Sequence, residues 1–179
     1  MSRSLVLALV VLGALVVLGA LAQPANADLE GETFTSETAG VRAEVPRGWR
    51  VSEVSGYPRV LFIMSRSTPP ARLFVAIDPI VPGCRTEVDA VFCSSDPGVA
   101  IAQLRERLDA AGFRVTAQTQ SRTPELEYEA NGRYVRHALI IIGDHVVSVM
   151  LATRSTTARS SLRRIFDRLT QSVRPTASE

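Results

Sequence analysis

Lysine is absent from this 179-residue chain, whose 20 basic residues are all arginine, against 18 acidic residues. The formal net charge of +2 is too small for a protein that binds nucleic acid through an excess of positive charge. Without lysine there is no Ser-x-x-Lys motif, and the chain also lacks a Gly-x-Ser-x-Gly elbow, a P-loop and a Gly-x-Gly-x-x-Gly loop. We therefore expect no enzyme, no cofactor and no metal site.

The first 27 residues have the three parts of a secretory signal: a positive start at Arg3, the apolar run Leu5–Ala22, and a small-x-small site at Ala25–Ala27. Cleavage is expected before Asp28. The apolar run is 18 residues long, which also reaches the length of a membrane span, so an uncleaved anchor remains the alternative. No cysteine follows the run, which argues against a lipoprotein. Both interpretations place the domain outside the cytoplasm, either secreted or periplasmic.

Cysteine is scarce, with Cys84 and Cys93 standing nine positions apart. In an oxidising compartment such a pair predicts a disulfide that closes a loop, worth about 2–3 kcal/mol in the chain-entropy model. A zinc site would need two further ligands nearby, and a redox pair is more often Cys-x-x-Cys. Free or redox-active thiols remain the alternative.

The 46% apolar content and the length suit one packed domain. After the leader (1–27) we place an acidic lead-in at 28–40, in which a short first strand is one interpretation, and the domain at 41–175. Alternation predicts strands at 41–45, 50–53, 59–65 and 73–77. Val45-Pro46-Arg47-Gly48 suits a type I turn, and residues 60–64 are apolar on both faces, as in an interior strand. A helix is predicted from the N-cap Asp96 to Gly112.

Two tight turns organise the second half of the chain. After a strand at 113–118, Asn131-Gly132 and Gly143-Asp144 predict consecutive hairpins built from 125–130, 133–142 and 145–151. The first turn pairs Ala130 with Arg133, Tyr128 with Val135, Glu127 with Arg136, and Leu126 with His137. Leu139, Ile141, Val146 and Met150 then share one face, while Ala138, Ile140, Ile142, Val147, Val149 and Leu151 share the other.

Because both faces of these strands are apolar, both must be covered. A last helix at about 156–173 covers one of them, and its apolar stripe lies within an arc of roughly 100°. The stripe consists of Ala158, Leu162, Ile165, Phe166, Leu169 and Val173. The sequence therefore predicts an α+β fold in which an antiparallel sheet is covered on both sides.

The two histidines, His137 and His145, fall on opposite faces of the predicted hairpin and so cannot share a metal. His137 lies among apolar residues, and we expect a core or boundary histidine whose ring nitrogens are hydrogen-bonded, with a functional histidine as the alternative. We expect His145, at the mouth of a hairpin, to be exposed to solvent.

Two charged groups have a structural and a functional interpretation. Glu125, Glu127 and Glu129 alternate along one strand and are interpreted as the solvent-exposed face of an edge strand. Acid–base catalysis is the functional interpretation, but nothing supplies the raised pKa that a general acid requires. The polar face of the last helix is interpreted as solvated, with contact to anionic lipid or an acidic partner as the alternative. That face carries Arg159, Arg163, Arg164 and Arg168, with Asp167.

The sequence resembles the PsbP-like family between about Val41 and Pro175. The similarity rests on an alternating strand into Glu44-Val45-Pro46-Arg47-Gly48-Trp49, a middle helix, late hairpins, and a closing strand and helix from Gly143 to Val173. The family includes photosystem II accessory proteins, a Ran-binding nuclear-import factor and bacterial envelope proteins such as the LpqN-type lipoproteins. The resemblance implies an antiparallel sheet with helices on both faces, an α/β/α sandwich, and no shared catalytic motif.

These observations together predict an exported, non-catalytic binding or accessory domain of the bacterial envelope. Its partner is expected to be a protein or a small ligand, with no nucleic acid, and with membrane contact only if the N-terminal segment is retained. One alternative is a membrane-anchored module that uses the arginine face of its last helix. The other is a secreted hydrolase whose site has no recognisable motif.

Overall fold

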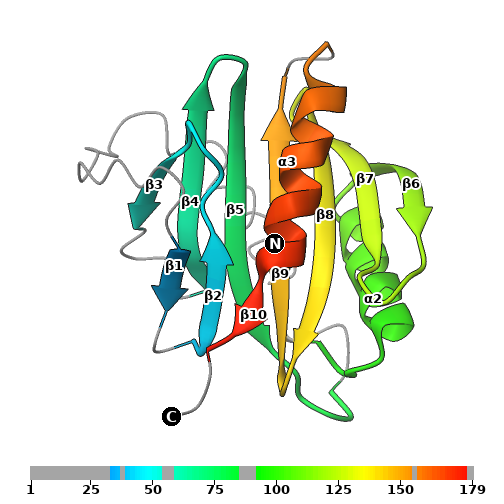
Figure 1. The fold of residues 1–179 in the computed structure, drawn as a ribbon. Coiled ribbons are helices and arrows are strands. Elements are labelled where there is room, and N and C mark those ends of the chain that lie inside the picture. The colour runs from blue at the N-terminus through cyan, green and yellow to red at the C-terminus, as the bar shows by residue number, and fades with distance from the viewer. Residues whose placement is uncertain (1–32, 37–38, 54–58, 85–91, 155–156, 177–179) are drawn as a thin grey trace.

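The computed structural model describes residues 33–36, 39–53, 59–84, 92–154 and 157–176 (Figure 1). The predicted signal or anchor at 1–27 lies outside the described residues, so the prediction stands untested. In the part that is described, neither helix is long and apolar enough to cross a membrane.

Seven antiparallel strands form the main sheet, in the order β3-β4-β5-β9-β8-β7-β6. Two helices accompany the sheet, α2 (Pro97–Ala110) and α3 (Arg159–Ser172), which makes the fold α+β. The strands are β3 (Arg50–Glu53), β4 (Val60–Ser67), β5 (Pro70–Pro79), β6 (Arg114–Thr119), β7 (Glu125–Ala130), β8 (Arg133–Ile142) and β9 (His145–Thr153). β4 lies between β3 and β5, which confirms the interior strand expected from its two apolar faces.

A second, three-stranded sheet, in the order β1-β2-β10, was not predicted. It consists of β1 (Thr33–Ser36), β2 (Val41–Glu44) and β10 (Arg174–Pro175), so the end of the domain pairs with its beginning. In Figure 1 this small sheet lies beside α3, and α3 contacts both β2 and β9. One face of the main sheet is therefore covered by a sheet as well as by a helix.

The hairpins β7-β8 and β8-β9 have the predicted register. Ala130 pairs with Arg133 and Leu126 with His137, and His137 pairs in turn with Met150. Asn131 (φ 52°) and Gly132 (φ 68°) both have positive φ, as a two-residue type I′ turn requires. Local turn chemistry therefore fixes the pairing of the central strands.

The core consists of two apolar clusters whose members alternate along β8 and β9. One cluster joins Ala138, Val147, Val149 and Leu151 to the α3 stripe Ala158, Leu162, Phe166, Leu169 and Val173. It also takes in Val41, Ala43, Val45 and Trp49 from the region of the small sheet. The other cluster joins Leu139, Val146 and Met150 to Ala100, Ile101 and Leu108 of α2. We call these surfaces of the sheet the α3 face and the α2 face.

Two local predictions are wrong. The turn after β2 is one residue further on than expected, because Trp49 N–H donates to Pro46 O (3.2 Å) and Gly48 has φ 75°. Glycine at the third position with positive φ is typical of a type II turn rather than type I. Also, β7 is not an edge strand, since β6 pairs with its outer side.

The first helix, α2, begins and ends where its flanking residues predict. The Asp96 side chain accepts from Val99 N–H at 2.9 Å and caps α2. Gly112 (φ 80°) ends the helix, and Phe113 N–H returns to Leu108 O at 2.9 Å. The last helix begins at Arg159, later than the expected Thr156, and residues 155–156 lie outside the described part.

Candidate functional site

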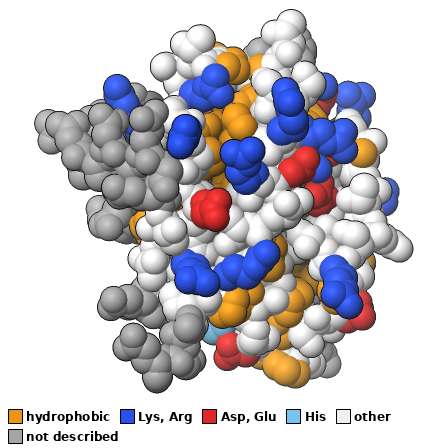
Figure 2. Space-filling model, viewed as in Figure 1, with side chains coloured by type: hydrophobic (Ala, Val, Ile, Leu, Met, Phe, Trp, Pro, Cys, Tyr) orange, Lys and Arg blue, Asp and Glu red, His pale blue; other side chains and the backbone are white. Residues whose placement is uncertain are grey.

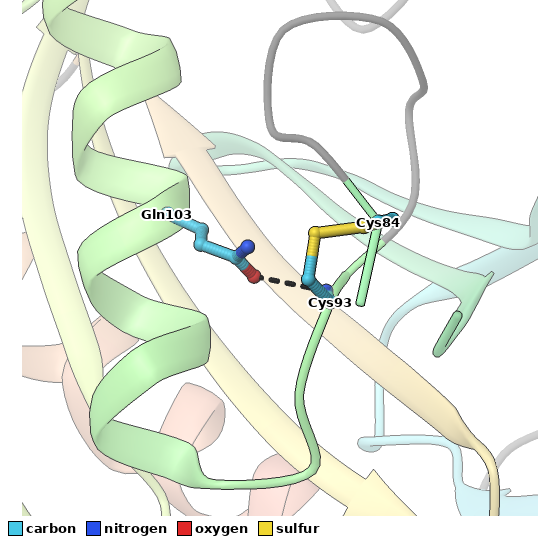
Figure 3. The surroundings of a disulfide bond; sticks show 3 residues. All are labelled: Cys84, Cys93 and Gln103. Atoms are coloured by element: carbon cyan, nitrogen blue, oxygen red, sulfur yellow. Dashed lines mark hydrogen bonds between the residues drawn. A yellow bond between two sulfur atoms is a disulfide. The ribbon is translucent and has the colours of Figure 1, made fainter. Parts of the chain in front are cut away.

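The structure joins Cys84 and Cys93 by a disulfide, as the sequence predicts. The bond links the chain after β5 to the segment before α2, and Cys93 N–H donates to Gln103 Oε1 of α2 at 3.1 Å (Figure 3). Next to it, the Arg107 guanidinium lies 5.0 Å from the centre of the buried Phe92 ring. The disulfide therefore helps to position α2, while residues 85–91 of its loop lie outside the described part.

His137 is in the core, on the α2 face, but the expected hydrogen bonds are missing. Its side chain is 4% exposed, and neither ring nitrogen has a hydrogen-bond partner among the described residues. Burial disfavours the imidazolium and lowers the pKa of His137 to about 3. The nearest aromatic ring described is that of Tyr128, 6.4 Å away, whose own pKa is raised by burial. His137 is therefore a neutral histidine that has no hydrogen-bond partner within the described part of the chain.

His145 is on the α3 face, because it pairs with Ile142. The two histidines thus lie on opposite faces of the sheet, as predicted. The His145 side chain is 40% exposed, and its Nδ1 lies 2.6 Å from Asp144 Oδ1. The described residues contain no group of three or more His, Cys, Asp or Glu that could hold a metal ion.

Arg136 brings two of the predicted charged groups together. It stands opposite Glu127 in the register, but its ion pairs are with Glu125 of β7 and Asp167 of α3. Its Nε donates to Glu125 Oε2 at 2.8 Å, and its Nη1 lies 2.8 Å from Asp167 Oδ1 without the alignment of a hydrogen bond. The guanidinium also lies 4.7 Å from the centre of the Phe166 ring. Arg136 therefore ties α3 to the sheet.

The three glutamates of β7 do not form a carboxylate pair. Glu125 forms an ion pair with Arg136, and Glu129 forms one with Arg114 at 3.1 Å. Glu127 is hydrogen-bonded to Tyr134. Burial, together with a hydrogen bond to Glu127, raises the pKa of Tyr134 to about 12. Each carboxylate has a partner of its own; Glu129 is exposed while Glu125 and Glu127 are half-buried, so the expected solvent-exposed face is found only in part.

A partly buried ion pair lies where β5 ends. Arg59 Nη1 donates to Asp78 Oδ1 at 3.2 Å. Burial raises the pKa of Asp78, and the charges of Arg59 and Arg107 oppose that shift. Because Arg107 belongs to α2, its charge adds an electrostatic link between this helix and the sheet.

The outer face of α3 is rich in arginine. Arg159, Arg163, Arg164 and Arg168 are exposed, and positive side chains gather on this side of the molecule (Figure 2). Arg159 stacks on the Tyr134 ring, with its guanidinium 4.4 Å from the ring centre.

Two shallow grooves flank the last turns of α3, and the sequence does not predict them. One, of about 320 Å³, is lined by Thr33, Arg42, Glu44, Gln171, Ser172 and Arg174. The other, of about 310 Å³, is lined by Ser121, Thr123, Glu125, Ile140, Asp167, Thr170, Gln171 and Arg174. Both grooves depend on the last turns of α3 and on Arg174. A two-residue strand such as β10 carries no periodicity by which it could have been predicted.

Comparison with solved structures gives the fold. The chain matches the solution structure of cyanobacterial PsbP from Synechocystis with a TM-score of 0.58 and 16% identity, over 87% of this chain and 98% of that one. The fold is PsbP-like. The Saccharomyces cerevisiae Ran-binding protein Mog1p matches with a TM-score of 0.54 and 11% identity, over 83% of this chain and 96% of that one.

A protein of Bacteroides thetaiotaomicron also matches, with a TM-score of 0.50 and 11% identity, over 83% of this chain and 50% of that one. No family model and no curated protein matches the sequence. At these identities the PsbP-like likeness shows the fold and carries no residue roles across.

Proposed function

We propose that this chain is an exported, non-catalytic binding or accessory domain of the bacterial envelope. The observation that carries the proposal is the PsbP-like fold, seen along nearly the full length of two solved proteins. One of them, Mog1p, is described as Ran-binding, so the fold is used elsewhere to bind a protein. Fold alone does not imply function, which is why the proposal names a role and not a partner.

The disulfide supports a place outside the cytoplasm. Disulfides persist in oxidising compartments and are rare where thiols are kept reduced. A signal-like leader precedes a domain whose two cysteines are bonded to each other. We infer that the leader is removed before Asp28.

The architecture suits a scaffold that binds through its surface. We infer a three-layer α/β/α sandwich, because α2 and α3 belong to different clusters that alternate along β8 and β9. Buried apolar side chains fill these layers, so the charged surfaces and shallow grooves are where a partner would bind.

N-terminal sequencing of the protein isolated from cells, together with thiol labelling before cell lysis, tests the export. We expect a chain that starts at Asp28 and whose Cys84 and Cys93 resist labelling until they are reduced. A start at Met1 with recovery in the membrane fraction would favour the anchored module. A soluble chain in the cytoplasm with two free thiols would contradict the proposal.

Cross-linking in the intact envelope tests the binding role. We expect a specific partner to be captured at wild-type expression. Its capture should be lost when residues of the charged surface or groove that it contacts are substituted. Turnover of ester, amide or glycosidic substrates by the purified chain would instead favour the secreted hydrolase.

A further inference from the structure

A polar groove lies beside the small sheet. It lies between β1, β2, β10 and the last turn of α3, and its volume is about 320 Å³. Thr33 and Glu44 lie at one cross-strand pair of β1 and β2, while Arg42 and Arg174 form a cross-strand pair of β2 and β10. Residues far apart in the sequence therefore meet in one groove.

Arg42 and Arg174 are like charges placed directly opposite each other, an arrangement that destabilises a sheet. Both are exposed, and neither lies within ion-pair distance of an acid among the described residues. Arg174 Nη1 donates to Val173 O at 2.7 Å, which leaves its other N–H groups for a ligand. A local conflict of this kind is typical of a functional site.

The walls of the groove are tied together. Glu44 N–H donates to Ser172 Oγ at 2.9 Å, and the same hydroxyl donates to Leu169 O at 2.7 Å. Thr176 N–H donates to Gly40 O at 2.9 Å just beyond the arginine pair. Ser172 therefore links α3 to β2, and these hydrogen bonds fix the backbone that carries the two arginines.

The free donors around the groove outnumber the oxygens of a carboxylate. Arg42 and Arg174 each present a planar fork of N–H groups, and the Gln171 amide and the Thr33 hydroxyl add further donors. A carboxylate offers two oxygens, and one guanidinium fork satisfies both, whereas a phosphate monoester offers three. The Glu44 carboxylate, also in the lining, limits the formal charge of the groove to +1.

We propose that this groove is a binding site for a phosphate monoester group, held by Arg42 and Arg174 with help from Thr33 and Gln171. The inference deepens the proposed binding role by naming a class of ligand. It is tested on the purified chain, so its result is independent of where the protein is exported and of which protein it meets.

The test compares two double variants that remove the same charge. R42Q/R174Q changes the groove, and R163Q/R168Q changes exposed arginines on α3 outside the groove lining. The chain is purified in the form that the cells process, and inorganic phosphate is titrated at constant ionic strength while amide chemical shifts are recorded. We expect saturable shifts centred on Thr33, Arg42 and Arg174, at least tenfold weaker binding in R42Q/R174Q, and a change under twofold in R163Q/R168Q.

Vesicles distinguish the two sources of a phosphate monoester. Phosphatidic acid in phosphatidylcholine vesicles presents the group on a lipid, and pure phosphatidylcholine is the blank. If binding to phosphatidic acid vesicles depends on the arginine pair and exceeds that of inorganic phosphate, the source is a lipid. If inorganic phosphate alone binds in that way, the ligand is soluble. Shifts that do not saturate, or equal losses in both double variants, would overturn the proposal.

Thermal stability separates a binding role from a structural one. Because the arginines repel each other, we expect R42Q/R174Q to melt at the same temperature as the native chain or higher without phosphate. Phosphate should then raise the melting temperature of the native chain and leave that of the double variant unchanged. If the double variant melts well below the native chain and phosphate has no effect on either, the pair is structural and the proposal fails.

Discussion

The two faces of the main sheet are held in different ways. On the α3 face, α3 buries Leu162, Phe166 and Leu169, and the Arg136 ion pairs add a second link to the sheet. On the α2 face, α2 buries two small or branched residues, Ala100 and Ile101, with Leu108 and the polar Gln103. That helix relies in addition on the neighbouring disulfide and on Gln103.

Polar groups are buried on both faces, with Arg136, Thr153 and Thr170 on the α3 face. The α2 face buries His137 and Tyr128, and the register places Ser148 there too, opposite Leu139. Buried polar atoms without a hydrogen-bond partner among the described residues destabilise a core, and both faces contain them: the ring nitrogens of His137 on the α2 face, and Trp49 Nε1, Arg136 Nη1 and Thr170 Oγ1 on the α3 face. The α3 helix is therefore attached by a large apolar stripe and by the Arg136 ion pairs, whereas α2 buries smaller side chains and lies next to the disulfide.

The largest effect is expected from truncating the core of the α3 face. Phe166 is fully buried, and it is also the ring on which Arg136 stacks. We expect Phe166→Ala to lower the free energy of unfolding by about 3–5 kcal/mol. Urea unfolding followed by circular dichroism measures the loss, with Ile165→Ala, which is only partly buried, as the milder control. A loss below about 1 kcal/mol would show that α3 is not the main cover of this face.

The ion pairs of Arg136 give the next effect. Arg136→Met keeps an unbranched stem but removes the guanidinium, which leaves Glu125 and Asp167 without their cation. Because the Asp167 side chain is 38% exposed and Glu125 19%, water recovers part of the loss, and we expect about 2 kcal/mol. Arg114→Met breaks an exposed pair, whose side chains are 75% and 49% exposed, and should cost under about 0.5 kcal/mol. If both variants lost the same free energy of unfolding, the Arg136 ion pairs would be no stronger than an exposed surface pair.

Opening the disulfide should affect the two helices differently. We expect Cys84→Ser/Cys93→Ser to lower the free energy of unfolding by about 2–3 kcal/mol, since the loop is then free in the unfolded chain. Amide hydrogen exchange should accelerate in α2, because Cys93 N–H no longer positions Gln103, and remain unchanged in α3. Equal acceleration of exchange in both helices would show that the disulfide does not hold α2 in particular.

The smallest effect at neutral pH should be a gain. His137→Leu replaces an unpartnered polar ring with an apolar side chain, and we expect about 1 kcal/mol of added stability in urea unfolding at pH 7. His145→Ala, at a half-exposed site, serves as the control and should change stability little. A clear loss of stability in His137→Leu would mean that the ring nitrogens are hydrogen-bonded in solution.

The burial of His137 also predicts how the stability of the fold depends on pH. Its pKa is about 3 in the folded chain against 6.5 when unfolded, so protons bind to the unfolded state first as the pH falls. Above pH 6.5 its ionisation does not affect stability, and between pH 6.5 and pH 3 stability declines as the pH falls, by up to about 1.4 kcal/mol per pH unit. Urea midpoints at pH 7, 5 and 4 should fall less steeply for His137→Leu than for the native chain. Parallel profiles would assign the acid sensitivity to other groups.

The central hairpins and the helix caps are predicted from the sequence because their causes are local. Asn131-Gly132 selects one turn, that turn determines the register of β7 and β8, and the register assigns each side chain to a face. The disulfide follows from the cysteine count and the expected compartment. Sequence reasoning finds both histidines on their correct faces for the same reason.

Side-chain partners and the grooves could not be predicted in this way. The register places Arg136 opposite Glu127, yet its long side chain reaches Glu125 and a helix that follows much later in the chain. The groove requires β10 to pair with β2, and a strand of two residues leaves no pattern in the sequence. His137 appears in the core pattern, but whether its nitrogens find partners depends on what packs against them.

The α+β class, the hairpin register and the division of apolar residues between two faces can all be predicted from the sequence. These follow from periodicity and turn chemistry, which act over a few neighbouring residues. The tertiary structure alone decided that β1, β2 and β10 form a second sheet, that Arg136 joins α3 to β7, and that Arg42 meets Arg174. Such contacts join segments distant in the chain, and their geometry depends on how the whole core packs.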